Sequence, residues 1–398
     1  MVVINSVPFT THLRVEKYGA KELLERDRAR ISNMLFTWAS QEGPFAFRKT
    51  TGADEGSLHS VDVTNSGLAY TMSVGVGQPP TDYTLLVDTG SAITWIGANL
   101  KKPYSPTDTS EDTSDSVQCS YGSGWMKGDL YTDTVTLSPD LVIKKQSIGI
   151  ARSTKGIRDV DGILGVGPAD LSKGKVKPGG RKLPTVTDNL YSEGTIPTDS
   201  LGIFYAPLTK VGEITGELTF GGVDETKITS DVNYVPLTTT APASQYWGIN
   251  QSITYGDTTI LDNASGFVDT GATFLLLTTS VFNAYRDAIG AYVDGATGLL
   301  AITEEQYNNL HSLIFHIGDV EYEFTPNAQI WPRALNSVLR GRSDRIYLVV
   351  AEFKPVRGSE SIHFVNGFVW LQRFYTVYDT TNAEVGFATT PFTDAETN

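Results

Sequence analysis

The chain has 398 residues, a formal net charge of −14 at pH 7, 38 glycines and a single cysteine, Cys119. This length is enough for two sizeable cores and an additional segment. The acidic balance argues against nucleic-acid binding, which needs a basic surface, and it suits a protein that works in acid. One cysteine allows neither an intrachain disulfide nor a zinc site built on cysteines.

Short runs rich in Val, Thr, Tyr and Phe alternate with Gly, Asp, Asn and Pro along most of the chain. This pattern is typical of a largely β protein with many turns. No apolar run reaches the roughly 18 residues of a membrane span, so we expect no membrane association. The five histidines form no ligand motif such as His-Glu-x-x-His, and we therefore expect no metal and no cofactor.

The first 50 residues differ in charge from the rest, with eight Lys and Arg against five Asp and Glu. Val7 to Val15 predicts a strand. Ala20 to Leu35 predicts an amphipathic helix. Its apolar face would consist of Leu23, Leu24, Ile31, Met34 and Leu35. Thr50 to Ser60 is polar and rich in glycine, which indicates an exposed junction.

The motif Asp-Thr-Gly occurs twice, at residues 88–90 and 269–271, each time directly after an apolar run. Each copy predicts a buried strand that enters a tight turn. A carboxylate in such a place is costly to bury unless it is hydrogen-bonded or neutral. One copy in each half of the chain suggests a duplicated fold that brings Asp88 and Asp269 to one seam.

Other patterns organise the chain around these two motifs. Leu68 to Val76 alternates and predicts a strand, whereas residues 105–116 predict a polar acidic loop. Gln118 to Gly128 predicts a hairpin with a Gly-Ser-Gly tip. Leu183 to Leu190 opens a short helix that ends at Gly194, and Val281 to Tyr292 predicts a second helix.

On these motifs, the chain from about Ser57 onward resembles the pepsin family of aspartic endopeptidases, especially its secreted fungal members. Residues 160–167, 216–222, 366–367, 373–379 and 385–388 match further strands of that family. The resemblance implies a mostly β, bilobal, pepsin-like acid protease fold, with two related β-barrel-like lobes and an active site in the cleft between them. It divides the chain into a prosegment, the N-terminal lobe with a flap, and the C-terminal lobe, at residues 1–56, 57–228 and 229–398.

The resemblance also implies the roles of particular residues. Asp88 and Asp269 would be the catalytic pair. Supporting residues would be Thr89, Gly90, Ser91, Thr270 and Gly271. The flap and substrate-binding residues would be Tyr121, Gly122 and Ser123, with Trp95 hydrogen-bonded to the flap tyrosine. Family prosegments place a lysine near the two aspartates, and Lys49 fits this position best, with Lys17 as the alternative.

The partners implied are polypeptide substrates and the prosegment itself, as an intramolecular inhibitor of a zymogen. We expect a secreted monomer whose signal peptide is absent from this chain, since Val2–Ile4 is too short for a signal core. A non-enzymatic binder on the same fold is the alternative, but both motifs and Tyr121 are intact. A serine hydrolase is excluded because no Gly-x-Ser-x-Gly elbow is present. One departure is Ala272, where many family members carry Ser or Thr after the second motif.

Overall fold

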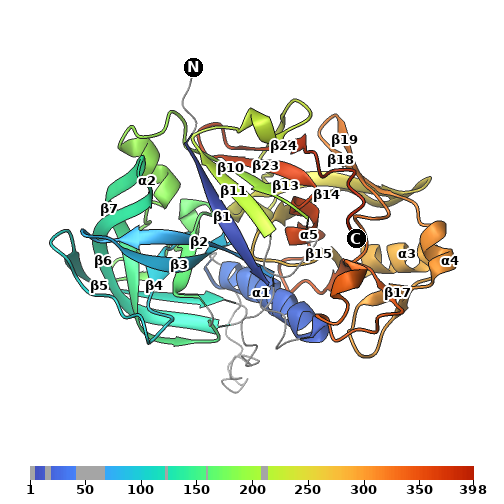
Figure 1. The fold of residues 1–398 in the computed structure, drawn as a ribbon, viewed down its shortest axis with the longest axis horizontal. Coiled ribbons are helices and arrows are strands. Elements are labelled where there is room, and N and C mark those ends of the chain that lie inside the picture. Colours follow the sequence, from blue (N-terminus) through green and yellow to red (C-terminus); the bar gives the residue numbers. More distant parts are fainter. Residues whose placement is uncertain (1–4, 14–18, 42–67, 122–123, 158–159, 208–213) are drawn as a thin grey trace.

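The structure is a computed structural model, and it describes residues 5–13, 19–41, 68–121, 124–157, 160–207 and 214–398. Strands make up 42% and helices 17%, so the predicted mostly β fold is confirmed. Figure 1 shows two bodies of strands with helix α1 (Ala20–Gln41) lying between them at the base of the molecule. No helix in these ranges is long and apolar enough to cross a membrane.

The largest sheet has 14 strands, in the order β12-β24-β23-β10-β11-β1-β2-β3-β8-β4-β7-β6-β5-β9. An additional pairing of β2 with β6 closes β2, β3, β8, β4, β7 and β6 into a six-stranded barrel. The strands of this sheet are β1 Asn5–Leu13, β2 Leu68–Val76, β3 Thr81–Asp88, β4 Trp95–Ile96, β5 Glu111–Tyr121, β6 Gly124–Ser138, β7 Leu141–Lys155, β8 Gly162–Gly165, β9 Val176–Lys177, β10 Ser200–Tyr205, β11 Ile214–Phe220, β12 Asn233–Pro236, β23 Phe374–Asp379 and β24 Glu384–Thr389.

A seven-stranded sheet, β19-β18-β13-β14-β22-β15-β21, and a three-stranded sheet, β16-β17-β20, form most of the second half. Their strands are β13 Gly248–Tyr255, β14 Thr258–Val268, β15 Leu275–Thr278, β16 Tyr292–Val293, β17 Leu300–Ile302, β18 Leu313–Ile317, β19 Val320–Phe324, β20 Ile346–Tyr347, β21 Val350–Phe353 and β22 Phe364–Asn366. The remaining helices are α2 Val186–Ser192, α3 Thr279–Ile289, α4 Glu304–Asn308 and α5 Phe368–Leu371.

Each Asp-Thr-Gly motif stands at the end of a buried strand that runs parallel to a neighbour. β3 ends at Asp88 and pairs in parallel with β8, while β14 ends one residue before Asp269 and pairs in parallel with β22. The residues that precede the aspartates, Val87 and Val268, are almost fully buried. The predicted buried strand before each motif is therefore confirmed, and the same local plan occurs in both halves.

The first part of the chain is built into this framework. β1 pairs antiparallel with both β11 and β2. Helix α1 begins at Ala20 as predicted but continues to Gln41, six residues beyond the predicted end at Leu35. All five residues of the predicted apolar face are buried, because the helix packs against the rest of the protein rather than lying on its surface.

Two predictions of local structure were wrong in part. The predicted acidic loop at residues 105–116 contains the start of β5, whose residues 111–116 pair with β6 across an irregular register. The predicted helix from Val281 to Tyr292 is α3, which ends at Ile289 because Gly290 adopts a left-handed conformation at φ 72°. Tyr292 therefore lies in β16 and is 39% exposed.

A buried carboxyl group gives the fold a dependence on pH. Burial, together with the neighbouring carboxylates of Asp188 and Asp379, raises the pKa of Asp199 to about 7 from its ordinary 3.8. A group whose pKa is raised on folding stabilises the protein fully below the unfolded pKa. That stabilisation is lost as pH rises through the folded pKa. Asp199 therefore favours the folded state in acid, and this contribution disappears near neutral pH.

We expect Asp199→Asn to reduce the loss of stability that the parent shows between about pH 4 and pH 8. The change should recover roughly 1–2 kcal/mol at pH 8 once solvent screening is allowed for, because the amide cannot ionise. Thermal unfolding followed across this range measures the effect. The exposed Asp140 offers a control, and Asp140→Asn should leave the pH dependence unchanged. Parallel curves for the parent and Asp199→Asn would contradict the assignment.

Candidate active site

The structure brings Asp88 and Asp269 to one buried site, with neither residue exposed. Gly90 N–H donates to Asp88 Oδ1 at 3.0 Å, and Gly271 N–H donates to Asp269 Oδ1 at 3.0 Å. A Cβ at either glycine would collide with Arg30, which lies against both aspartates. The two glycines thus leave room for a group that contacts the pair.

The two motif turns are tied to each other by their threonines. Thr89 N–H donates to Thr270 Oγ1 at 3.0 Å, and Thr270 N–H donates to Thr89 Oγ1 at 3.0 Å. Both side chains are almost fully buried, so these bonds are shielded from water. This reciprocal arrangement holds the two aspartates at a constant relative position.

The surroundings of the two carboxylates are not identical. Ser91 Oγ donates to Asp88 Oδ2 at 2.6 Å. Ala272 occupies the corresponding place after Asp269 and has only a methyl group, which is 1% exposed. Asp88 therefore has one more hydroxyl donor from its own turn than Asp269 has, as the sequence suggested.

Arg30 on α1 lies between the aspartates. Its Nη2 donates to Asp88 Oδ1 at 2.5 Å and to Asp269 Oδ1 at 2.8 Å, and its Nε donates to Asp269 Oδ2 at 2.7 Å. Burial by itself lowers the pKa of Arg30, but the charges and hydrogen bonds of Asp269 and Asp88 outweigh it and raise the pKa well above its ordinary value. The guanidinium is thus held charged against the pair.

The sequence reasoning did not identify Arg30, although a signal was present. Arg26, Arg30 and Met34 are spaced four residues apart, so they follow one another along one face of the helix. Two arginines beside a face that is otherwise apolar indicate a buried partner of opposite charge. The predicted contact, Lys49, and the alternative, Lys17, both lie outside the described residues, and it is Arg30 that the structure places on the aspartates.

Asp27 anchors the same helix to the second motif turn. Its Oδ2 accepts hydrogen bonds from the backbone N–H groups of Thr273 at 2.7 Å and Phe274 at 3.0 Å. Asp27 is fully buried, and burial, opposed by the charge of Arg26 and by these bonds, raises its pKa to about 6. The helix therefore presents a cation to the aspartates and an acceptor to the adjoining backbone.

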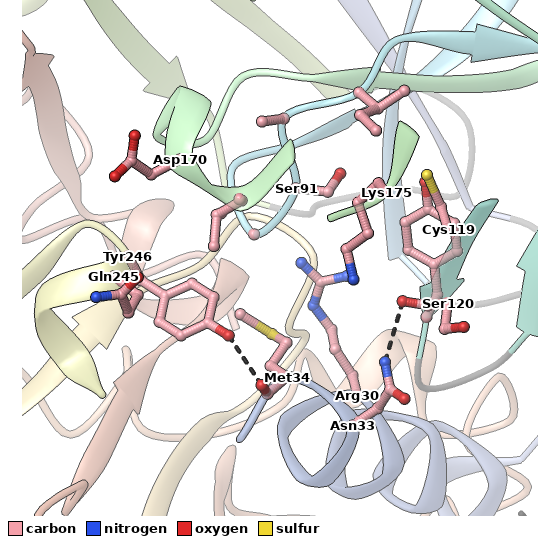
Figure 2. A pocket seen from close by; sticks show the side chains of 15 residues that line it. Arg30, Asn33, Met34, Ser91, Cys119, Ser120, Asp170, Lys175, Gln245 and Tyr246 are labelled. Atoms are coloured by element: carbon pink, nitrogen blue, oxygen red, sulfur yellow. Dashed lines mark hydrogen bonds between the residues drawn. The ribbon is translucent and has the colours of Figure 1, made fainter. Parts of the chain in front are cut away.

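The arm of the predicted flap and the second half of the chain hold α1 from two sides. Asn33 Nδ2 donates to the carbonyl of Ser120 at 3.0 Å on one side. Tyr246 Oη donates to the carbonyl of Met34 at 3.0 Å on the other. Figure 2 shows both bonds. The helix consequently occupies the space directly in front of the two aspartates.

Trp95 and Tyr121 lie beside the site in the first half. Trp95 Nε1 donates to Tyr121 Oη at 2.7 Å, and the ring centroids are 6.3 Å apart. This bond is the one that the resemblance implied. Gly122 and Ser123, at the tip of the hairpin, lie outside the described residues.

The site contains two carboxyl groups that are held side by side and can serve in acid–base chemistry. In the part of the chain that the structure describes, no cluster of His, Cys, Asp and Glu could hold a metal ion. A cavity of about 70 Å³ remains next to Arg30. Its lining residues are Arg30, Asn33, Met34, Gly90, Ser91, Ala92, Ile93, Cys119, Ser120, Tyr121, Asp170, Leu171, Lys175, Gln245 and Tyr246.

Comparisons with known proteins agree with this geometry. The family described as "Eukaryotic aspartyl protease" matches residues 69–390. Polyporopepsin of Irpex lacteus is 51% identical over 341 residues, which cover 85% of this chain and 99% of that protein. Gastricsin of Cavia porcellus is 28% identical over 412 residues, covering 98% of each chain. The crystal structure of the aspartic proteinase from Irpex lacteus matches with a TM-score of 0.79 and 51% identity, covering 83% of this chain and 96% of that one.

Proposed function

Since the chain belongs to the eukaryotic aspartyl protease family, we propose that it hydrolyses peptide bonds in acid with a water activated between Asp88 and Asp269, and that its leader inhibits it. The leader is residues 1–56, the predicted prosegment. The observation that carries the proposal is the seating of Arg30, since one leader residue contacts both carboxylates of the pair.

Two adjacent carboxyl groups cannot both remain charged, so a free pair shares one proton over a wide acidic range. In our proposal the ionised member takes a proton from a bound water, and the neutral member donates its proton to the carbonyl oxygen of the substrate. Gly90, Gly271 and the threonine ties support this role because they position both carboxylates. The same intact set favours an enzyme over the alternative of a non-enzymatic binder.

The geometry supports inhibition by occupancy, because α1 fills the place where a substrate would meet the aspartates. Protonation of Asp88 or Asp269 removes the negative charge that holds Arg30, so acid weakens the docking of the leader. Asp27 acts in the opposite direction. Its pKa is raised to about 6 when docked, so its contribution to docking is fully present below the undocked value of 3.8 and is lost as pH rises through about 6. In this proposal, acid therefore releases the leader by protonating the catalytic pair and not by protonating Asp27.

The alignment with gastricsin reaches into the leader, since it covers 98% of this chain, whereas that with polyporopepsin covers 85%. This difference supports a separate leader before the two lobes that we propose at residues 57–228 and 229–398. We also propose that the protein is a secreted monomer. The glycosylation sequons at Asn250 and Asn263 are compatible with secretion, because both asparagines are exposed.

Asp88→Asn and Asp269→Asn should each abolish hydrolysis of an unfolded protein at about pH 3–5 and leave the fold intact. The two carboxyl groups act as one unit, so losing either costs nearly the whole rate, at least about 10³-fold. Peptide release gives the rate, and circular dichroism reports the fold. Substantial activity in either variant would show that the pair is not the catalytic centre.

Arg30→Ala should release the leader at a higher pH than in the parent. Removing one partner of a buried charge pair costs about 3–5 kcal/mol, so the variant should show at least about 100-fold more activity on a short peptide at pH 5–6, measured immediately after mixing. Arg28 provides the control, because it is on the same helix but contacts Glu352 instead. Arg28→Ala should show as little activity as the parent in the same measurement.

Mass spectrometry of the parent after exposure to acid should show loss of roughly the first 50–60 residues, cut in the polar junction.

A full-length Arg30→Ala chain that stays as inactive as the parent would contradict inhibition through Arg30.

Ala272→Ser should shift the acidic limb of the activity profile to lower pH. A hydroxyl at this place would donate to Asp269 as Ser91 does to Asp88, and such a bond favours the ionised carboxylate. The expected shift is about 0.5–1 pH unit, and it belongs to the pair rather than to one residue. Ser91→Ala should move the limb in the opposite direction. Superimposable profiles of kcat/KM against pH would exclude this tuning.

A further inference from the structure

The cavity beside Arg30 contains a lysine that the proposed reaction does not use. Lys175 precedes β9 and is half-buried in the wall of the cavity. Figure 2 shows its side chain reaching into the pocket between Ser91 and the flap arm at Cys119. Ser91 and Tyr121 line the same cavity, so this lysine lies beside the first motif turn and the arm of the predicted flap.

The backbone of Lys175 is fixed from two sides. Its N–H donates to the carbonyl of Ser172 at 3.1 Å, and its carbonyl accepts from Gln118 N–H, in the flap arm, at 2.9 Å. The next residue, Val176, pairs with Val117 of β5 and is fully buried. The position of the ammonium is therefore limited to what its own side chain can reach within the cavity.

The charge of Lys175 has no counterpart in the described residues, where its Nζ forms neither an ion pair nor a hydrogen bond. Nearby lysines differ in this respect, because Lys173 and Lys182 pair with Asp170 at 2.6 and 2.9 Å. Burial lowers the pKa of Lys175, and Cys119 is the opposing influence. Burial raises the pKa of the Cys119 thiol to about 11, so the thiol is neutral in acid and supplies no anion.

We propose that Lys175 is a specificity-determining residue that makes this protease prefer substrates with an aspartate or glutamate side chain at the position that enters the cavity. The inference rests on the proposed catalytic function. A half-buried ammonium without a partner gains a charge-assisted bond from such a carboxylate, whereas a basic substrate side chain would be repelled. The catalytic mechanism proposed above does not require this preference, because the preference depends on the side chain of Lys175 alone.

The preference depends on pH because the acidic side chain of the substrate titrates. A glutamate side chain has an ordinary pKa of about 4.3, so it pairs with Lys175 above that pH and loses its charge below it. The other titratable groups around the cavity do not reproduce this change. Asp170 is already matched by two lysines, Tyr121 and Tyr246 have raised pKa values and stay neutral, and Arg30 departs with the leader.

The test uses the full-length chain after exposure to acid and pairs of peptides that differ only by Glu or Gln, scanned through each position around the scissile bond. At one position we expect kcat/KM to be about five- to tenfold higher for Glu than for Gln at pH 5.5, with the ratio falling toward one at pH 3. Lys175→Met should abolish the ratio while Gln peptides are still cleaved, and Lys175→Arg should retain it. Lys177→Met is the control, because Lys177 carries the same charge two residues away but is exposed and outside the cavity.

Cleavage of the Gln peptides without a preference for Glu at any position would overturn the role of Lys175 and leave the endopeptidase proposal standing. A preference that survives in Lys175→Met, or that is lost equally in Lys177→Met, would also overturn it. If no peptide of either kind is cleaved, the proposed function itself fails, which is a distinguishable result.

Discussion

Two carboxylates lie buried in one site, at the ends of β3 and β14, and the rest of the structure depends on how their charge is accommodated. Burying such groups without partners would cost several kcal/mol each. The chain meets this requirement with backbone donors from Gly90 and Gly271 and a guanidinium from Arg30. In the docked state the guanidinium contacts both carboxylates, in the place where the proposed catalysis needs a water.

In our proposal, the leader helix takes the place of a substrate but presents a guanidinium instead of a peptide bond. Its contacts with the active-site turns have two kinds of pH dependence, since Arg30 is held by charges that acid removes, and Asp27 docks better when it is protonated. Release in acid requires the first effect to exceed the second. The reciprocal bonds of Thr89 and Thr270 do not involve the leader, so the pair can keep its geometry when the helix leaves.

The two Asp-Thr-Gly turns share the same backbone arrangement but differ in the side chains around them. Asp88 keeps a hydroxyl donor in Ser91, whereas Ala272 gives Asp269 none. The first half also supplies the hairpin with Tyr121 and the cavity wall with Lys175. The proposed effects on proton affinity and substrate choice each come from a single side chain beside the motifs, so they require no change in the backbone of the two turns.

The sequence by itself determined the two Asp-Thr-Gly turns, the strands that lead into them and the apolar face of α1, because these follow from local patterns of one face or one strand. It also indicated the Trp95–Tyr121 contact through a family resemblance. Tertiary structure alone decided that Arg30 contacts the aspartates, since the rotation and depth of a docked helix depend on packing with residues more than 200 positions away. It alone decided that Lys175 faces a cavity in which the described residues supply no counter-charge, because the presence or absence of a partner is a property of the assembled surface and not of any segment.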